Sequence, residues 1–149
     1  MLANRTQEQT DRENRDYCKR IAEELDAIAS GTVYRCPECG EQIDVDGLEE
    51  DKDGYIICPE CGKRISIDDA EQYTMYDYFE YALDVDYVVG SDREYRGVRV
   101  MVACGGPNIY VDTMEKAVTL YWWTDSARYL LSTAAANAID EYFEECWNS

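Results

Sequence analysis

Apolar residues recur at helical spacing near both ends of the chain. The first stripe begins after Thr10 and stops before Ser30-Gly31, where a glycine suits the end of a helix. Its members are Cys18, Ile21, Ala22, Leu25, Ile28 and Ala29. A second stripe begins near Ser132 and consists of Ala135, Ala138, Ile139, Tyr142, Phe143 and Cys146. The spacing predicts one amphipathic helix at each end of the sequence.

Between these helices the pattern changes from helical to alternating. A further helix is expected from Asp68, which would cap it, and its buried stripe consists of Met75, Phe79, Ala82 and Leu83. Four alternating runs then predict strands at 85–89, 98–104, 109–111 and 118–122, each followed by turn residues. The short connections favour an antiparallel meander.

A repeated cysteine motif precedes this region. Cys36-Pro-Glu-Cys39-Gly40 returns as Cys58-Pro-Glu-Cys61-Gly62, with 18 residues between Cys39 and Cys58. This spacing is typical of a four-cysteine zinc ribbon, in which two tight turns aim four thiolates at one Zn²⁺. The alternatives are two disulfides or a redox pair, but a redox motif would not normally occur twice. Four protein ligands close the coordination sphere, so we expect a structural ion and no metal catalysis.

These patterns together predict an α+β fold in three parts. Residues 1–31 form the N-terminal helix, residues 32–67 the zinc ribbon, and residues 68–149 an acidic α+β domain. In that last part, a four-stranded antiparallel meander is flanked by two helices.

The charge of the chain restricts its partners. The sequence has 32 acidic and 14 basic residues and no histidine, which gives a formal charge of −18. Such a charge repels nucleic acid and anionic membranes and favours a basic protein partner. The lack of histidine excludes serine–histidine and cysteine–histidine catalytic pairs.

The compartment is expected to be cytoplasmic. Residues 1–16 are polar and lack the apolar centre of a signal peptide, and no run reaches membrane-spanning length. Cysteines in a chain without an export signal are expected to be reduced or bound to metal.

Acidic and aromatic residues supply the candidate partner-binding sites. Residues 68–149 contain sixteen acidic and five basic side chains. The last helix carries carboxylates where its dipole disfavours them, so they form either a solvated face or a surface that imitates phosphate. Side chains alternate along a strand, so one indole of Trp122-Trp123 is expected in the core and the other either exposed or packed under a neighbouring helix. The candidates are Tyr76, Asp77, Glu80, Trp123, Asp140, Glu141, Glu144 and Glu145.

A glycine-rich segment near Cys104 is open to two interpretations. Gly105-Gly106-Pro107-Asn108 is either a ligand loop beside a nucleophilic Cys104 or a simple hairpin turn. Cys104 falls on the apolar register of its strand, and no histidine is present to activate it. A buried, unreactive thiol is therefore expected.

The second half of the chain resembles a known family. The runs at 104–113 (CGGPNIYVDT), 120–125 (LYWWTD) and 140–145 (DEYFEE) look like those of small acidic proteins carried on bacterial mobile elements and phages. That family has no assigned activity, and the resemblance covers roughly half of the chain. It implies a setting in which accessory proteins often counter host defence.

Three functions remain open at this point. The first is a non-enzymatic acidic protein that inhibits a nucleic-acid-processing host defence enzyme, of anti-restriction or anti-CRISPR type, by imitating nucleic acid. The second is a zinc-ribbon adaptor that acts in transcription or replication through protein contacts. The third is an enzyme with a second metal held by Asp84, Asp86, Asp112 and Asp125, although nothing in their spacing singles these residues out. The charge and the lack of histidine favour the first.

Overall fold

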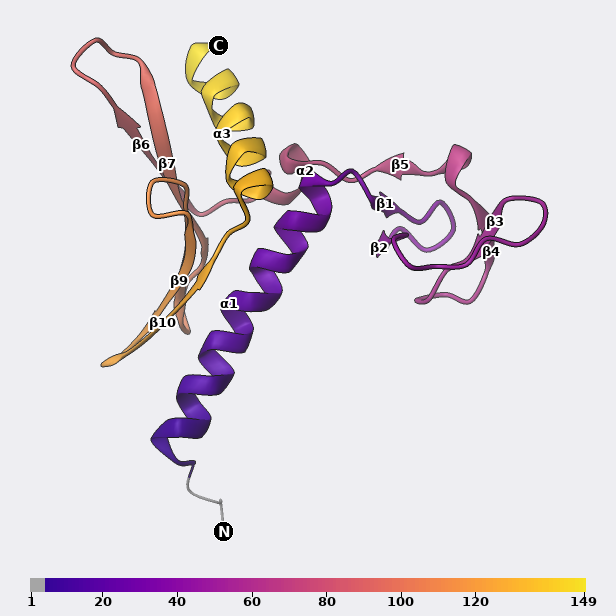
Figure 1. Cartoon of the computed structure of the whole chain (residues 1–149), viewed down its shortest axis with the longest axis horizontal. Coiled ribbons are helices and arrows are strands. Elements are labelled where there is room, and N and C mark those ends of the chain that lie inside the picture. Colours follow the sequence, from indigo (N-terminus) through magenta and orange to yellow (C-terminus); the bar gives the residue numbers. More distant parts are fainter. Residues whose placement is uncertain (1–4) are drawn as a thin grey trace.

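A five-stranded antiparallel sheet forms one side of the protein (Figure 1). It is seen in a computed structural model that describes residues 5–149, so residues 1–4 lie outside the described part. The strands are β6 (Asp84–Val89), β7 (Tyr95–Ala103), β8 (Asn108–Asp112), β9 (Ala117–Trp122) and β10 (Asp125–Leu130). Their order, β10-β9-β8-β7-β6, is that of a continuous meander.

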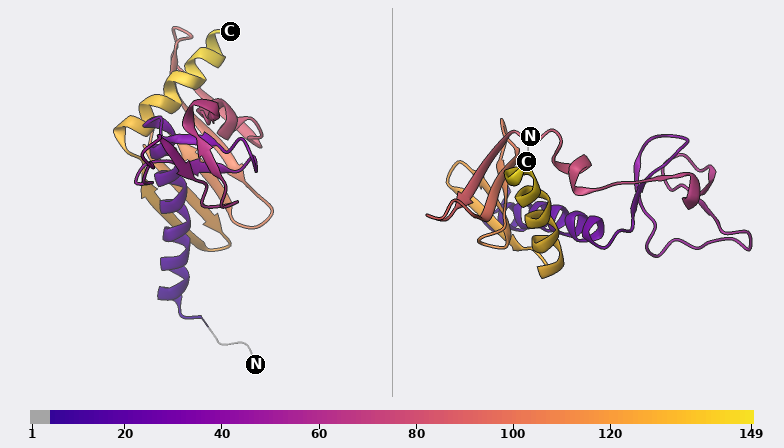
Figure 2. Two further views of the ribbon diagram at one scale, coloured as in Figure 1. Left: turned by 90° about the vertical axis from the view of Figure 1, so that its right-hand side faces the viewer. Right: turned by 90° about the horizontal axis from the view of Figure 1, so that it is seen from above.

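Two long helices cover one face of this sheet (Figures 1 and 2). They are α1 (Gln7–Ala29), which packs on β9 and β10, and α3 (Thr133–Asn148), which packs on β7 and on α1. The apolar stripes of both helices meet the inward side chains of the strands. Leu25, Val100, Leu120 and Ile139 are completely buried there, and this burial is the main favourable term in folding.

The other face of the sheet carries no helix in the described residues. Strand register places its side chains in two rows that cross all five strands. One row is Asp84, Met101, Tyr110, Thr119 and Arg128, and the other is Asp86, Arg99, Asp112, Ala117 and Leu130. We call these residues, together with Tyr121, the outer face.

The cysteine motif lies in a separate small unit on the helix side of the molecule (Figure 1). Its strands are β1 (Val33–Arg35), β2 (Gln42–Asp44), β3 (Tyr55–Ile57), β4 (Arg64–Ser66) and β5 (Glu71–Gln72). They form a three-stranded sheet, β2-β1-β5, and the hairpin β3-β4. Ile43, Ile56 and Ile65 are buried between them with Cys36 and Cys58, so the unit has a core of its own.

Strand β1 of this small unit contacts the main body. Val33 of β1 is buried in the main core, and its carbonyl accepts a hydrogen bond from the Tyr73 amide at 2.9 Å. Arg35 lies 3.6 Å from the Asp77 carboxylate and 5.4 Å from the centre of the Tyr73 ring.

The structure confirms the α+β class, the N-terminal helix and the antiparallel pairing, but the prediction of four strands is wrong. Thr124-Asp125 is expected to end the sheet, yet the chain reverses there and adds β10. From this strand only Ala127 and Tyr129 pack against the apolar core, and Asp125 on the same side bonds Gln7 of α1, so the apolar pattern of the strand is weak.

The predicted helix from Asp68 is also wrong in its bounds. Residues Ile67–Asp69 form one 3₁₀ turn, and β5 then pairs with β1. The helix that follows, α2 (Met75–Phe79), is only about one turn long. Its N-cap is Thr74, which forms a capping box with Asp77.

The first helix starts earlier than its apolar stripe predicts, because a capping box of Thr6 and Gln9 begins it at Gln7. Within residues 5–149, no helix combines the length and apolar character needed to cross a bilayer.

Candidate functional site

The two cysteine knuckles have the same backbone structure. In each, the amide of the first cysteine donates to a carbonyl five residues later, from Cys36 to Glu41 at 2.8 Å and from Cys58 to Lys63 at 2.9 Å. The glycine after the second cysteine donates back to the first, at 2.9 Å in both knuckles. These glycines have φ values of 78° and 75°, a conformation that side chains disfavour. The repeated sequence thus encodes a repeated turn.

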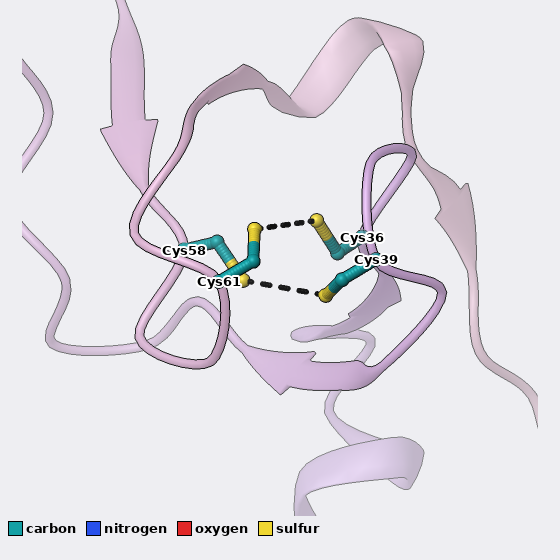
Figure 3. Close-up of side chains that lie close together, drawn as sticks. All are labelled: Cys36, Cys39, Cys58 and Cys61. Carbon is teal, nitrogen blue, oxygen red and sulfur yellow. Dashed lines mark hydrogen bonds between the residues drawn. The ribbon is translucent and has the colours of Figure 1, made fainter.

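The turns bring four sulfurs together (Figure 3). The Sγ atoms of Cys36, Cys39, Cys58 and Cys61 all lie within 4.8 Å of one another. The two closest contacts across the knuckles, from Cys36 to Cys61 and from Cys39 to Cys58, are 3.9 Å each. A disulfide would need about 2.05 Å. A tetrahedral ion with metal–sulfur bonds of about 2.3 Å places its sulfurs about 3.8 Å apart, so the geometry suits one metal ion.

The electrostatics of the cluster differ from one thiol to the next. Burial opposes ionisation of Cys36, but the amides of Cys39 and Glu38 outweigh it and lower the pKa of Cys36 to about 7. The Glu41 amide favours the Cys39 thiolate, yet desolvation and the neighbouring thiols outweigh this amide and raise the pKa of Cys39 to about 12. The cluster therefore holds protons that a cation must displace when it binds.

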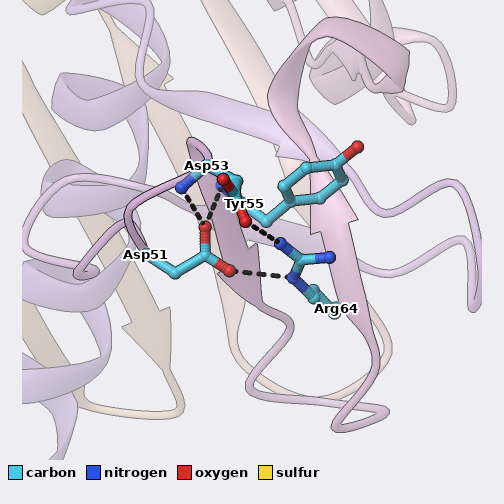
Figure 4. Close-up of polar contacts among 4 residues, drawn as sticks. All are labelled: Asp51, Asp53, Tyr55 and Arg64. Carbon is cyan, nitrogen blue, oxygen red and sulfur yellow. Dashed lines mark hydrogen bonds and ion pairs between the residues drawn. The ribbon is translucent and has the colours of Figure 1, made fainter.

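A polar network fixes the hairpin that carries the second knuckle (Figure 4). One oxygen of Asp51 accepts from the amides of Asp53 and Tyr55, at 2.9 and 3.0 Å, and the other accepts from Arg64 Nε at 2.8 Å. The Arg64 hydrogen bond, with help from the Tyr55 amide, lowers the pKa of Asp51 to about 2. The guanidinium also lies 3.9 Å from the centre of the Tyr55 ring. This network orients β3 and β4 on either side of Cys58.

The donor set matches a structural metal site. Four sulfur ligands complete a tetrahedral sphere, and the backbone amide of Glu38 lies 3.4 Å from the Cys36 sulfur, where it would stabilise a bound thiolate. Cys36 and Cys58 are buried, whereas Cys39 is at the surface. An arrangement of this kind can tie the two knuckles together, but it leaves no position for a substrate.

The predicted partner-binding residues on α2 have different environments. Tyr76 is 58 % exposed, and its ring makes an edge contact with Tyr142. Asp77 accepts a hydrogen bond from the Thr74 amide at 2.8 Å, so it has a structural role in the helix cap. Glu80, just beyond the helix, is exposed.

The carboxylates of α3 also divide into two groups. Asp140 accepts a hydrogen bond from the Tyr95 hydroxyl at 2.7 Å and so helps to hold α3 against β7. Glu141, Glu144 and Glu145 are exposed and form no ion pair in the described residues. Of the four predicted carboxylates on α3, only these three remain candidates for contact with a partner.

The predicted alternation of Trp122 and Trp123 is wrong. Strand β9 ends at Trp122, and Trp123 lies in the two-residue turn to β10 with a φ of 56°. Both side chains are exposed, Trp122 by 38 % and Trp123 by 87 %, and their rings form an edge contact. The tip of this hairpin is therefore an exposed aromatic pair.

The predicted burial of Cys104 is wrong as well. The register of β7 shifts between Met101 and Ala103, so the alternation does not continue to Cys104, which is exposed just after the strand. Gly105, with a φ of 86°, begins the reversal to β8. The segment is a hairpin connection, as one of the two interpretations expects.

Sequence reasoning did not identify the outer face as a candidate surface. The sequence pattern that could have revealed this face is the set of strand residues that alternate with the buried ones, notably Arg99, Tyr110 and Tyr121. The Arg99 guanidinium lies 3.6 Å from the centre of the Tyr110 ring, which in turn meets Tyr121 edge-on with 6.1 Å between ring centres.

Comparison with known proteins returns no match. No protein-family model, curated protein or solved structure matches the chain.

Proposed function

We propose that this chain is a zinc-stabilised acidic binding protein without catalysis of its own. It docks on a basic nucleic-acid-processing protein, such as a restriction or CRISPR nuclease of a bacterial host, and competes there with nucleic acid. The observation that carries the proposal is the large number of unpaired carboxylates on the surface.

Most acidic side chains in the described residues form no ion pair. All 32 carboxylates lie in the described residues, and eight of them form an ion pair, which leaves 24 without one. Glu141, Glu144 and Glu145 stand near the C-terminal end of α3, where the helix dipole disfavours negative charge. Stability alone would place basic residues there. Charges that oppose stability support a role in binding a cationic surface.

Zinc is the ion that we assign to the four cysteines. Tetrahedral thiolate sites hold zinc or iron, and closed four-cysteine sites of zinc are structural. The residues that would hold it are Cys36, Cys39, Cys58 and Cys61, all within 4.8 Å of one another. Bound there, the ion would join the two hairpins of a unit whose core has few apolar side chains.

The experiment measures DNA cleavage by restriction and CRISPR nucleases with and without the purified protein. We expect wild-type protein to inhibit at least one of them, with inhibition that weakens as salt rises from about 50 to about 300 mM. Changing Glu141, Glu144 and Glu145 to glutamine should weaken inhibition. The matched control changes the exposed ribbon residues Glu49, Glu50 and Glu60 to glutamine, which removes the same charge. Asp140 stays unchanged because it bonds Tyr95.

One result would overturn this proposal, and another would remove α3 from its binding surface. If no nuclease is inhibited and no basic nucleic-acid-binding protein is bound, imitation of nucleic acid is excluded. If the α3 variant inhibits as well as wild type while the ribbon control does not, the carboxylates of α3 are a solvated face.

A zinc-ribbon adaptor in transcription or replication is the second candidate. The metal unit lies apart from the sheet, and Ile57 on its surface is 57 % exposed (Figure 1). An exposed isoleucine on a protruding unit suits a protein contact. If a partner is lost on changing Ile57 to serine but is kept by the α3 variant, the adaptor function is favoured.

A further inference from the structure

We propose that a second copy of this chain docks along α1 and β10, so that the protein forms a two-fold dimer through this edge of its sheet. In the dimer the two α1 helices run antiparallel, and the two β10 strands meet at their free edges. The N-terminal half of α1 and the C-terminal end of α3 lie at opposite ends of the molecule (Figure 1). Dimer formation is therefore independent of the carboxylates that the proposed function uses.

Strand β10 is an edge of the sheet that lacks the usual protection. In the described residues it pairs only with β9, and its six residue pairs follow one another without a bulge. The opposite edge, β6, has a register shift near its end and two exposed aspartates, Asp84 and Asp86. Bulges and charges are the devices that stop an edge strand from pairing with another chain. On β10 the one exposed charge, Arg128, bonds back to the Glu115 carbonyl at 3.1 Å, and Leu130 is 64 % exposed.

A groove lies along this edge, between α1 and β10. One hollow of about 500 Å³ lies between the two elements, and a second of about 440 Å³ extends past Arg128 and Leu130. Arg15 and Tyr129 line both hollows, so we call the combined surface the edge groove. Besides Tyr129, the first hollow is lined by six charged residues of α1: Glu8, Asp11, Arg12, Arg15, Asp16 and Lys19.

The charges of the edge groove balance, although the chain as a whole is strongly acidic. The three carboxylates and three basic groups from α1 sum to zero, whereas the whole sequence carries −18. In the described residues only Lys19 of these six forms an ion pair, with Glu23 at 3.9 Å. Two copies of so acidic a chain repel each other over most of their surface. That repulsion is locally absent at the edge groove, which favours a second copy as the occupant.

The order of these charges makes α1 complementary to a reversed copy of itself. The acidic Glu8 and Asp11 lie nearer the N-terminus, and the basic Arg15 and Lys19 follow them. At about 100° per residue, these four positions lie within about 80° of one helix face. The midpoints of the pairs Asp11–Arg15 and Glu8–Lys19 almost coincide. A single two-fold axis at that point therefore places each acidic group opposite a basic group of the second copy.

The spacing of the two layers allows the strands and the helices to meet at the same time. Paired strands lie about 4.8 Å apart. Helix α1 packs on both β10 and β9, so its axis lies roughly half a strand spacing inside the edge. When β10 pairs with its copy, the two α1 axes are then about 10 Å apart, within the range of packed helices.

The test exchanges the charges of Asp11 and Arg15 and measures the mass of the zinc-loaded protein by sedimentation equilibrium at about 150 mM salt. Wild type should reach the mass of two chains at about 100 µM and no more, because a two-fold contact is closed. Asp11→Arg and Arg15→Asp should each weaken dimerisation about tenfold, since each places like charges opposite each other at both contacts. The variant with both changes restores the contacts and should dimerise like wild type.

Mixing the two single variants gives the sharpest comparison. In the mixed dimer both contacts again join an arginine to an aspartate, so the mixture should dimerise about tenfold more tightly than either variant alone. The matched controls, Glu49→Arg and Lys52→Asp, change the charge equally at exposed ribbon positions and should dimerise like wild type. Thermal unfolding shows whether each variant is folded.

Wild-type protein that stays monomeric at about 100 µM would overturn the inference, as would a mixture that dimerises no more tightly than its components. Species larger than two chains would exclude the two-fold arrangement. Amide hydrogen exchange in β10 that is no slower in wild type than in Asp11→Arg would exclude the strand contact.

These outcomes are distinct from those of the proposed function. Nuclease inhibition by a protein that stays monomeric leaves the proposed function standing and refutes the dimer. Dimerisation with the expected charge pattern, without inhibition of any nuclease, does the reverse.

Discussion

Single cysteines in this protein differ in what surrounds them. Four share one cluster, Cys18 on the buried side of α1 is completely buried, and Cys104 and Cys146 are exposed. The first four are held by repeated turns whose glycines and amide hydrogen bonds act locally. Their role follows from spacing, whereas the environments of the other three depend on tertiary structure.

The ligand set makes a direct prediction about metal content. Purified wild-type protein should contain one zinc per chain, and Cys58→Ser should lose it to a mild chelator because three thiolates bind far more weakly than four. Elemental analysis for zinc and iron is the measurement. Cys104→Ser is the control and should keep its zinc, since Cys104 lies outside the cluster. Full zinc in the Cys58 variant would contradict the assignment.

The buried thiol of Cys18 predicts a dependence of stability on alkaline pH. Burial raises its pKa to about 11, against about 8.5 for a thiol in the unfolded chain. Because the pKa is higher in the folded state, the contribution of the buried, protonated Cys18 thiol to the free energy of unfolding is fully present below pH about 8.5. This contribution is lost as pH rises towards 11.

Urea denaturation at several pH values checks this dependence. The free energy of unfolding of wild type should fall more steeply between pH 8.5 and 10 than that of Cys18→Ala, although the variant starts lower. If the free energy of unfolding falls equally steeply with pH in wild type and in Cys18→Ala, then folding does not change the pKa of Cys18.

Among the elements, the β9–β10 hairpin combines two unfavourable features. Trp123 has a φ of 56°, which bulky residues adopt at a cost of roughly 1–2 kcal/mol, and its indole is 87 % exposed. Neither feature stabilises the fold, so the pair supports a role in binding.

Trp123→Gly should therefore stabilise the protein by about 1 kcal/mol, because glycine adopts a positive φ without strain. Thr124→Gly, at the next position, should destabilise it, since φ there is not positive and glycine only adds entropy to the unfolded chain. Thermal unfolding of the two variants gives the comparison. A loss of stability in the Trp123 variant would mean that the indole packs favourably.

Elements with their own local signals could be predicted from the sequence, and the others could not. The knuckles and α3 are encoded by turn residues, a cap at Ser132 and a continuous apolar stripe. Strand β10 was missed because only Ala127 and Tyr129 of its six residues face the core. The short α2 was misjudged because pairing of Glu71 with β1 overrides the helical pattern around it. Likewise, the bond from Tyr95 to Asp140 joins residues 45 positions apart, and no local pattern reveals it.

For the whole molecule, net charge governs association. At −18, the protein should show no binding to DNA or RNA in a gel shift at micromolar concentration and physiological salt. A variant in which four surface carboxylates become lysine, at Glu49, Glu50, Glu144 and Glu145, serves as the comparison and should migrate with DNA more readily. A complex with wild-type protein would instead make the metal unit a nucleic-acid reader.

The double connection between the metal unit and the main body has a hydrodynamic consequence. Strand β1 enters the unit from α1, β5 leads back to α2, and the two strands pair with each other. Such a two-stranded joint resists twisting far more than a single linker does. The loaded protein should tumble as one anisotropic particle, with one set of rotational correlation times for amides in both parts. After metal removal, nitrogen relaxation should separate into two regimes, slow for the five-stranded sheet and fast for residues 36–66.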